Sequence, residues 1–292
     1  MHADVVHLHS VFLWPTLSAA RAARSAGVPY VLSPRGMLVR QLIERRNSLL
    51  KRAWIALFER RNVEAAAAVH CTSELERKEL LALGLSPRAT FVVPNGVDLP
   101  GAPPVRVTSD TILYLGRINW KKGLERLIES LRDVPRGQLV IAGNDEEGLT
   151  PQLQAVAAAA GVAARVVFAG YVEGEAKRRL LTEATVLVLP SISENFGNAV
   201  LEAMAHGCPV VVTPDVGLAD AVRASGAGVV SEADPASLAR AIRGLTEDPA
   251  RRAAAGGAAL ALVNERFGWD RVATEMTREY ERVVGAGERG HA

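Results

Sequence analysis

Cysteine, lysine and aromatic residues are scarce in this sequence. Its 292 residues include two cysteines, five lysines and 5% aromatic residues. Two cysteines exclude a disulfide framework, and we expect the reducing cytoplasm as the location of the chain. No apolar run reaches the roughly 18 residues that a membrane span needs, and no charged-then-apolar leader opens the sequence.

Apolar residues are plentiful by contrast. The hydrophobic content of 49% excludes a largely disordered chain, and the length predicts about two domains, each with a core of its own. The net charge of +2 conceals a split, because residues 1–105 have a net charge of +5 and the remainder has a net charge of −3.

Residues 35–61 are strongly basic. Two acidic residues, Glu44 and Glu59, stand there against eight basic ones, which are Arg35, Arg40, Arg45, Arg46, Lys51, Arg52, Arg60 and Arg61. The local charge of +6 leaves two interpretations open. The stretch faces an anionic partner, or it is an ordinary solvated helix face.

Short β-branched runs alternate with longer amphipathic stretches. This alternation indicates βαβ units and parallel sheets, whose strands are apolar on both faces. Strands are predicted at Val5–Leu8, Tyr30–Leu32, Ala68–Thr72, Phe91–Val93, Ile112–Leu115, Leu139–Ala142, Val166–Ala169, Val186–Leu189 and Val210–Thr213, with helices such as Leu124–Leu131 and Val200–Ala205 between them. The Pro/Gly cluster Leu99–Pro104 predicts a linker. We therefore expect two α/β domains, residues 1–104 and 105–268, with a cleft between them.

The first strand of the second domain leads into a basic turn. Gly116 permits a close backbone approach, and Arg117 and Lys122 place two cations beside the start of the next helix. A helix N-terminus with adjacent cations suits a diphosphate. A solvated basic turn is the alternative.

Residues 190–202 contain two carboxylates. Glu194 lies in the loop before a helix and Glu202 lies within that helix, so both can point into one cleft. The free amides of residues 196–198 would meet a phosphate or sugar oxygen there. A helix-capping glutamate followed by an exposed one is the alternative.

Two strand ends in the first domain carry further polar residues. Alternation puts His7 and His9 on the same side of their strand, with His9 at its carboxyl end, where a ligand would reach it. A structural role is the alternative for His9. Arg35 follows the next strand, and it either meets an acidic substrate group or anchors its loop. Metal-binding, nucleophile-elbow and P-loop motifs are absent, which disfavours a metal-assisted mechanism, and no metal site is predicted.

These motifs occur together in one known family. They are the Glu-x7-Glu element Glu194–Glu202, the Gly-Arg pair followed by Lys122-Gly123, and the Ser-Pro-Arg-Gly, His70–Glu74 and Pro94–Asp98 segments. Together they resemble the motifs of retaining glycosyltransferases of the GT-B fold, family 4. The Ser-Pro-Arg-Gly-Met segment is similar to that of bacterial exopolysaccharide and capsule transferases. The resemblance implies two Rossmann-like domains that face a cleft, the first of them incomplete because the family's opening βα units are missing. Residues 269–292 resemble the family's last helix, which crosses back to the first domain.

The resemblance also implies roles for single residues. The implied donor-binding residues are Gly116, Arg117, Lys122, Val172, Glu194, Phe196, Gly197, Asn198 and Glu202. Arg117 and Lys122 would hold the diphosphate, and Val172 would lie near the nucleobase. Glu202 would bind the ribose and Glu194 the transferred sugar. The implied catalytic residues are Glu194, His9, Arg117 and Lys122, and Arg35 would lie on the acceptor side.

The implied reaction moves a sugar from a nucleotide-sugar donor to a polysaccharide or lipid-linked oligosaccharide acceptor with retention of anomeric configuration. It needs no metal or other cofactor, and catalysis rests on positioning and electrostatic stabilisation. Two alternatives stay open, namely a donor-binding but inactive fragment and a GT-B-type sugar-nucleotide epimerase. A lipid-linked acceptor leads us to expect that residues 35–61 face an anionic membrane surface, the inner face of the cytoplasmic membrane. No nucleic-acid partner is expected.

Overall fold

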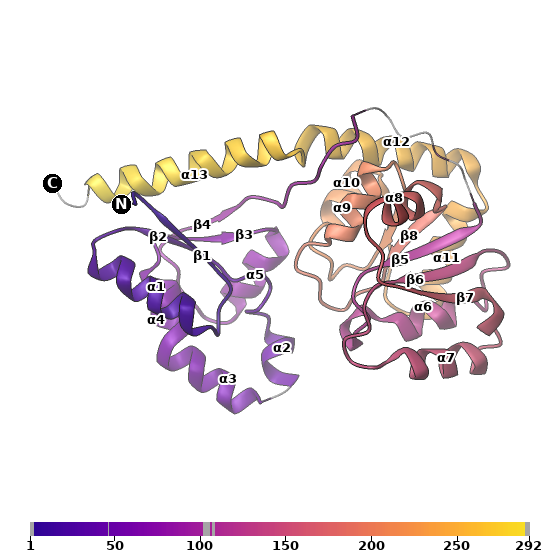
Figure 1. The fold of residues 1–292 in the computed structure, drawn as a ribbon, viewed down its shortest axis with the longest axis horizontal. Helices are drawn as coiled ribbons and strands as arrows, with labels where there is room; N and C mark the ends of the chain where they lie inside the picture. The colour runs from indigo at the N-terminus through magenta and orange to yellow at the C-terminus, as the bar shows by residue number, and fades with distance from the viewer. Residues whose placement is uncertain (1–2, 46, 102–105, 107–108, 290–292) are drawn as a thin grey trace. The chain divides into compact units, whose positions relative to one another are not determined.

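The computed structural model describes residues 3–45, 47–101, 106 and 109–289. The chain divides into two compact units (Figure 1). Unit 1 consists of Met1–Asn95 and Trp269–Ala292, and unit 2 consists of Gly96–Gly268. The structure therefore divides the chain after Asn95, earlier than the expected boundary after residue 104. Of the expected linker, residues 102–104 lie outside the described residues.

Unit 2 is built on a six-stranded parallel sheet. Its strand order is β10-β9-β8-β5-β6-β7. The strands are β5 (Thr111–Leu115), β6 (Gln138–Ala142), β7 (Val166–Gly170), β8 (Val186–Leu189), β9 (Val210–Val212) and β10 (Gly228–Val230). The predicted parallel sheet is confirmed, and most strand limits lie within one or two residues of those expected. β10 is not among the expected strands, because it begins at a glycine and contributes only two β-branched residues.

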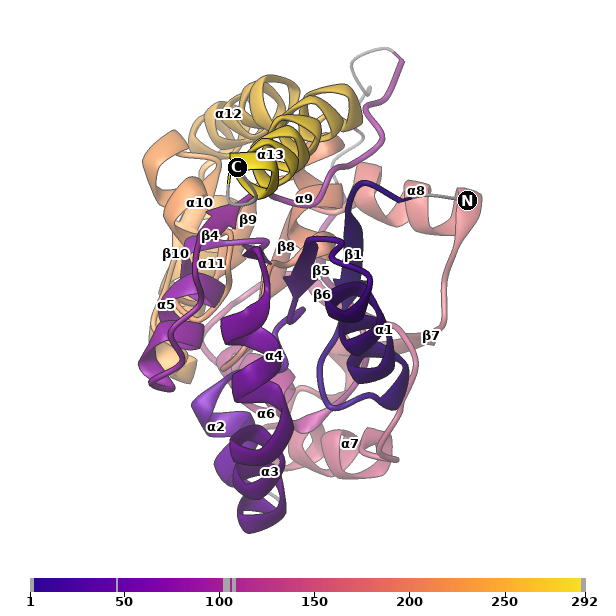
Figure 2. The same ribbon diagram turned by 90° about the vertical axis from the view of Figure 1, so that its left-hand side faces the viewer.

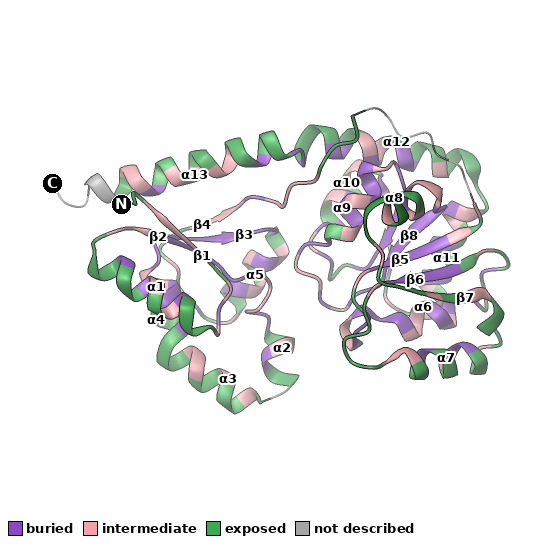
Figure 3. Cartoon of the chain, viewed as in Figure 1, coloured by how far each residue is buried: buried purple, intermediate pink, exposed green. Residues whose placement is uncertain are grey.

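Two layers of helices cover this sheet. The helices are α6 (Leu124–Ser130), α7 (Thr150–Ala159), α8 (Gly174–Glu183), α9 (Asn198–Ala205), α10 (Ala219–Ser225), α11 (Pro235–Thr246) and α12 (Pro249–Arg266). α6, α7 and α11 pack together, and α12 packs against α9 and α10. Covered on both sides, the central strands β5, β6 and β8 are largely buried, as Figure 3 shows. This explains their apolar sequences.

The chain reverses direction across the sheet of unit 2 between β5 and β8. From β5 it proceeds outward through β6 to β7, and from β8 it proceeds outward on the other side through β9 to β10. In parallel sheets of this kind, a crevice opens at the carboxyl ends of the two strands that flank the reversal, and ligands bind there. The loops after β5 and β8 are therefore the first place to look for a site.

Unit 1 is built on a four-stranded parallel sheet in the order β1-β2-β3-β4. The strands are β1 (Val6–His9), β2 (Tyr30–Ser33), β3 (Ala68–Cys71) and β4 (Thr90–Val92). The helices are α1 (Trp14–Ser25), α2 (Arg40–Arg45), α3 (Ser48–Trp54), α4 (Arg60–Ala65), α5 (Glu74–Ala82) and α13 (Trp269–Arg289). A π-helical segment, Ile55–Glu59, joins α3 to α4 without a break.

The strand order of unit 1 determines which face each helix covers. All three crossovers proceed in the same direction, and right-handed crossovers of that kind place their helices on one face. On that face α1, α4 and α5 bury a cluster that includes Leu32 and Val69. The opposite face is covered by α13, through Val283 and Tyr280, as the views in Figure 1 and Figure 2 agree. None of the helices in the described ranges is long and apolar enough to cross a membrane.

Candidate functional site

Three loops at the carboxyl edge of the sheet in unit 2 are joined by backbone hydrogen bonds. The amide of Ile192, after β8, donates to the carbonyl of Lys121, after β5, at 2.9 Å. The amide of Glu194 donates to the carbonyl of Asp215, after β9, also at 2.9 Å. The loops thus form one rigid rim at the point where the chain reverses direction.

Lys122 and Glu194 form an ion pair on this rim. The Nζ atom of Lys122 contacts Oε2 of Glu194, and the two side chains are 8% and 21% exposed. Gly123, with a φ of +66°, allows the approach of the two loops, because a Cβ atom there would overlap the carbonyl oxygen of Pro190. The structure therefore brings together two of the residues that the sequence singles out.

The neighbouring helix α9 begins at Asn198. Gly197, with a φ of +101°, precedes it in the left-handed conformation that glycine adopts most easily. The first amides of a helix have no acceptor within the helix, and its dipole adds partial positive charge. Phe196 is buried beneath this turn. The N-terminus of α9 therefore has the properties of an anion site.

Two buried polar atoms beside the rim lack protein partners. Among the residues that the structure describes, Oδ1 of Asn119 and Oγ of Ser191 have no hydrogen-bond partner. Asn119 follows β5 and Ser191 follows β8, so both lie at the reversal of the sheet. Leaving a buried polar atom unpaired costs about 1 to 3 kcal/mol, and a polar ligand would relieve that cost.

The other predicted donor residues of unit 2 have different partners. Arg117 is paired with Glu146 at 3.0 Å, and both side chains are exposed. Glu202, on α9, is paired with Lys177, on α8, at 3.1 Å. Glu194 and Glu202 are thus each bonded to a different lysine.

Gly116 and Val172 lie at the same edge of the sheet, after β5 and β7, and β6 separates these two strands. Gly116 follows β5, and a Cβ atom at Gly143, after β6, would overlap its carbonyl oxygen. Gly143 has a φ of +148°, so this close approach of the two loops requires glycine. Val172 follows the edge strand β7 and packs against the core of unit 2.

In unit 1 the predicted residues His9 and Arg35 are in contact. Nε and Nη2 of Arg35 lie 3.2 and 3.1 Å from Nδ1 of His9, and Nη1 of Arg35 donates to Oδ1 of Asn95 at 3.0 Å. The rings of His7 and His9 stack with their centroids 4.3 Å apart, which confirms that both lie on the same side of β1. Arg35 therefore anchors His9 and also links the loop after β2 to Asn95.

A row of hydrogen bonds crosses the sheet of unit 1 behind His9. His7 lies 2.6 Å from the hydroxyl of Tyr280 and 2.7 Å from the hydroxyl of Ser33. Ser33 in turn lies 2.8 Å from Nδ1 of His70, whose Nε2 lies 2.8 Å from the carbonyl oxygen of Val93. Burial, together with the charges of neighbouring His9, His70 and Arg35, lowers the pKa of His7 to about 3. Burial also lowers the pKa of His70 to about 4.

The buried carboxylate of Glu76 holds the loop of Arg35 in place. Its Oε1 accepts from the amide of Gly36 and its Oε2 from the amide of Thr72, both at 2.7 Å. Two loops at the carboxyl edge of unit 1 are thereby joined. Arg35 itself has a φ of +56°, a conformation that these bonds must maintain.

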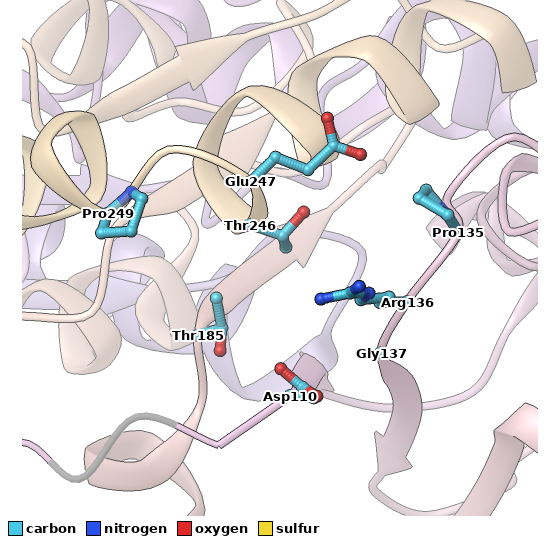
Figure 4. Close-up of a pocket in the computed structure, with 8 residues that line it drawn as sticks. All are labelled: Asp110, Pro135, Arg136, Gly137, Thr185, Thr246, Glu247 and Pro249. Atoms are coloured by element: carbon cyan, nitrogen blue, oxygen red, sulfur yellow. The ribbon is translucent and has the colours of Figure 1, made fainter.

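A hollow also exists at the opposite edge of the sheet in unit 2. It has a volume of about 590 Å³ and is lined by residues such as Asp110, Gly137 and Thr185, which precede β5, β6 and β8 (Figure 4). Ligands of such sheets bind at the carboxyl ends of the strands, so this hollow at the amino ends is not the candidate site. Within the described part of the chain, no group of three or more His, Cys, Asp or Glu residues is placed to hold a metal ion.

Several partners of the site residues were not identifiable from sequence motifs. They are Glu146, Lys177 and Tyr280, each far along the chain from the residue it contacts. The scarcity of lysine is a signal that could have drawn attention to Lys177, one of five in the chain.

Comparisons with known proteins match both units. A family model described as "Glycosyl transferases group 1" matches residues 100–260, and one described as "Glycosyl transferase 4-like domain" matches residues 1–96. A D-inositol 3-phosphate glycosyltransferase of Kineococcus radiotolerans is 32% identical over 276 residues, which cover 80% of this chain and 61% of the relative. An uncharacterized glycosyltransferase of Methanocaldococcus jannaschii is 34% identical over 174 residues, which cover 58% of this chain and 44% of that relative. The chain thus spans less than two thirds of the length of both relatives.

Solved structures share the fold. A sucrose-phosphate synthase from Thermosynechococcus elongatus superposes with a TM-score of 0.82 at 24% identity, covering 97% of this chain and 74% of that one. HepE of Anabaena, solved with UDP and glucose, superposes with a TM-score of 0.78 at 20% identity, covering 96% and 78%. The expected GT-B architecture of two parallel-sheet units is confirmed.

Replacing Lys122 by Met should destabilise unit 2 by about 3 kcal/mol, because it leaves the half-buried carboxylate of Glu194 without its cation. Replacing Arg117 by Met is the matched control and should cost less than about 1 kcal/mol, since its ion pair is exposed. Urea unfolding of both variants measures the difference. In the double variant Lys122→Met/Glu194→Gln, part of the loss should be recovered. Equal costs for the two single variants would contradict the assigned difference in burial.

The stability of unit 1 should decrease below about pH 6.5. The folded pKa values of His7 and His70, about 3 and about 4, lie below the value of 6.5 for the unfolded chain. The unfolded chain therefore binds more protons between these values, and each histidine reduces the free energy of unfolding by about 2 kcal/mol at pH 5. Urea unfolding at pH values from about 7.5 to about 5 measures how the free energy of unfolding changes with pH. This change should be smaller in a His70→Gln variant, and an unchanged pH dependence would refute the low pKa of His70.

Proposed function

We propose that this chain, which belongs to the glycosyltransferases of group 1, transfers a sugar from a nucleotide-diphosphate sugar to an acceptor hydroxyl with retention of anomeric configuration. The observation that carries the proposal is the Lys122–Glu194 pair beside the N-terminus of α9, at the reversal of the strand order. A buried cation, a helix N-terminus and a carboxylate occur there together. This combination suits a ligand that carries both phosphate and hydroxyl groups.

The cations of the rim and the amides of α9 supply the recognition of the diphosphate. Lys122 acts as a point charge and Arg117 as a fork with several donors, two complementary ways to bind phosphate oxygens. Arg117 is exposed and paired only at the surface with Glu146, so exchanging that partner for a phosphate has a small cost. Glu202 binds the ribose hydroxyls, and Val172 lies near the nucleobase.

Carboxylate oxygens accept hydrogen bonds, which is the property that a sugar-binding residue needs. Glu194 is held in place by Lys122 and by its own backbone bonds to the loop after β9. It can therefore accept from hydroxyl groups of the transferred sugar without losing its position. Because the side chain is pre-organised, less rotamer entropy is lost when the donor binds.

In the proposed reaction, the bond between the anomeric carbon and the diphosphate oxygen breaks while the acceptor oxygen bonds to the same face of that carbon. The proton of the acceptor hydroxyl moves to an oxygen of the departing diphosphate. Arg117 and Lys122 offset the negative charge that develops there. These two cations are the reason why we propose a reaction that needs no metal. His9 donates a hydrogen bond to the donor sugar, and Arg35 contributes to the acceptor side.

The proposed acceptor is a polysaccharide or a lipid-linked oligosaccharide, and the proposed location is the cytoplasmic face of an anionic membrane. An exposed apolar surface on the helical segment 48–65 supports this location. We call it the apolar crest, and it consists of Leu49, Leu50, Leu57, Phe58 and the half-buried Trp54 of that segment, together with Trp14 of α1. Leu49 is 81% exposed, Leu57 is 70% exposed and Trp14 is 65% exposed. The rings of Trp14, Trp54 and Phe58 pack on one another.

Exposed basic residues occur on the same part of the chain as the apolar crest. Arg52 and Arg61 are exposed on the segment 48–65 and Arg45 on α2, while Arg46 lies outside the described residues and Arg35 contacts His9 instead. Apolar and aromatic side chains rimmed by cations are typical of elements that lie in the interface of an anionic bilayer. The charge supports a lipid surface over a neutral partner.

Replacing Glu194 by Gln should reduce the kcat/KM of transfer by about 100-fold or more. The glutamine side chain carries no charge to pair with Lys122, and its single amide oxygen accepts less well from the sugar hydroxyls than a carboxylate does. Glu175→Gln is the matched control, since it removes an exposed carboxylate paired with Arg178, and should change the rate by less than about twofold. Undiminished transfer by the Glu194 variant would refute the assignment.

Product analysis separates the alternatives. With donor and acceptor together, release of the nucleotide diphosphate and a glycoside of retained anomeric configuration support transfer. With the donor alone, an epimerised nucleotide sugar would instead indicate an epimerase. Nucleotide binding by calorimetry without turnover in any acceptor screen would indicate a donor-binding but inactive fragment.

Replacing Leu50 and Leu57 by Ser should weaken binding to vesicles that contain anionic lipid by roughly tenfold or more, because two exposed side chains no longer enter the interface. Leu81→Ser, on α5, is the control, since Leu81 is exposed but lies outside the apolar crest. Binding of the unchanged chain should also decrease with added salt. Salt-independent binding, or equal binding by both variants, would remove the membrane from the proposal.

A further inference from the structure

The hydrogen bonds behind His9 have only one consistent arrangement of protons. The carbonyl oxygen of Val93 can only accept, so the Nε2 atom of His70 carries a proton. His70 is buried and neutral at pH 7, which leaves its Nδ1 atom as an acceptor. The hydroxyl proton of Ser33 must therefore be donated to His70.

The same argument continues to the next ring. Because the hydroxyl of Ser33 has used its proton, it accepts from Nε2 of His7, and that atom is protonated. Since His7 is neutral as well, its Nδ1 atom accepts from the hydroxyl of Tyr280. We call this series of bonds, from Tyr280 through His7, Ser33 and His70 to Val93, the relay. It crosses all four strands of unit 1 and begins on α13.

His9 stacks on the first ring of the relay, and Arg35 determines its tautomer. A guanidinium only donates, and two of its nitrogens, Nε and Nη2, point at Nδ1 of His9. Nδ1 is therefore unprotonated, and a neutral His9 carries its proton on Nε2. Burial, with the adjacent Arg35 charge, lowers the pKa of His9, which favours the neutral ring. His9 itself is exposed, so Nε2 is open to a ligand.

We propose that Arg35 is a positioning residue that holds His9 as a hydrogen-bond donor through Nε2, that the relay fixes the ring of His7 on which His9 stacks, and that the ligand of His9 is an oxygen acceptor, a hydroxyl or a phosphate oxygen. His9 is then not a general base, because the lone pair that a base needs is on Nδ1 and is occupied by Arg35. The groups that face the two stacked rings are His70 and Ser33 on the neighbouring strands, Arg35 on its loop and Tyr280 on α13. Tyr280 and Arg35 donate to Nδ1 of His7 and of His9, Ser33 accepts from Nε2 of His7, and His70 packs edge-on against His7.

The tautomers can be measured directly in the chain with 15N-labelled histidine, because long-range 15N–1H spectra distinguish protonated from unprotonated ring nitrogens. At pH 7 we expect His7, His9 and His70, assigned by single His→Gln variants, to be protonated on Nε2. His206 is an internal reference of the opposite kind, since its Nδ1 lies 2.9 Å from the carbonyl oxygen of Glu202 and must donate to it. A charged His9, or one protonated on Nδ1, would overturn the proposal.

Two variants test the positioning residues separately. Arg35→Leu should give His9 a mixture of tautomers and leave the relay unchanged. Ser33→Ala should change the signals of His7 and His70 and leave the His9 tautomer as it was. Arg271→Gln, which removes an exposed ion pair on α13, is the control and should leave all three rings unchanged. If Arg35→Leu leaves His9 fixed on Nε2, Arg35 does not set its tautomer.

The role of His9 toward a ligand rests on the proposed transfer activity and has a test of its own. A glutamine amide can replace the Nε2 donor, so His9→Gln should retain about tenfold more kcat/KM than His9→Leu, and the rate should not decline with an apparent pKa from His9 between about pH 6 and pH 8. Equal loss in both variants, or an acid limb that disappears with His9, would indicate a base. The tautomer spectra do not depend on turnover, so failure of the transfer activity and failure of this inference are distinguishable.

Discussion

The reversal of the strand order between β5 and β8 is the constraint on which the rest of unit 2 depends. Because the chain leaves these adjacent strands in opposite directions, their loops diverge and leave a crevice between them. The backbone bonds of residues 192 and 194, and the glycine at 123, draw the loops together around it. The rim then contains a buried lysine and a carboxylate that stabilise each other. Neither charge would be stable there alone, so the pair that maintains the rim is also the pair to which we assign the chemistry of the proposed site.

In unit 1 the strand order contains no reversal, and it too determines where the polar side chains gather. Its strands proceed in one direction, so its crossover helices gather on one face and α13 covers the other. That second face carries histidine and serine side chains at alternate positions of β1, β2 and β3, and the hydroxyl of Tyr280 completes their hydrogen bonds. A wholly apolar face would pack α13 with less directional preference. The polar row instead specifies where the helix lies, which is the best-supported use of buried polar groups.

The sequence predicted those features that depend only on a local period or on a short motif. The strands of both units, the shared side of His7 and His9, and the loop position of Glu194 against the helical position of Glu202 are all local properties. The partners were not predictable, because they depend on strand order. Glu146 reaches Arg117 only since β6 is beside β5, and Lys177 reaches Glu202 only since α8 packs near α9. Periodicity contains no information about which elements become neighbours.

The helical segment 48–65 departs from the usual burial pattern of an amphipathic helix. Apolar residues that recur at helical spacing normally face the core, yet Leu50 and Leu57 are exposed and Glu59 is fully buried. The carboxylate of Glu59 accepts from the amide of Phe12 and from the indole of Trp54, five residues earlier, a spacing that suits the π-helical turn. Each exposed leucine forgoes the roughly 1.5 to 3 kcal/mol that full burial would supply. A helix that buries its acid and exposes leucines on a segment that also carries arginines supports the anionic bilayer that we propose as its partner, because both its apolar and its charged residues would contact such a surface.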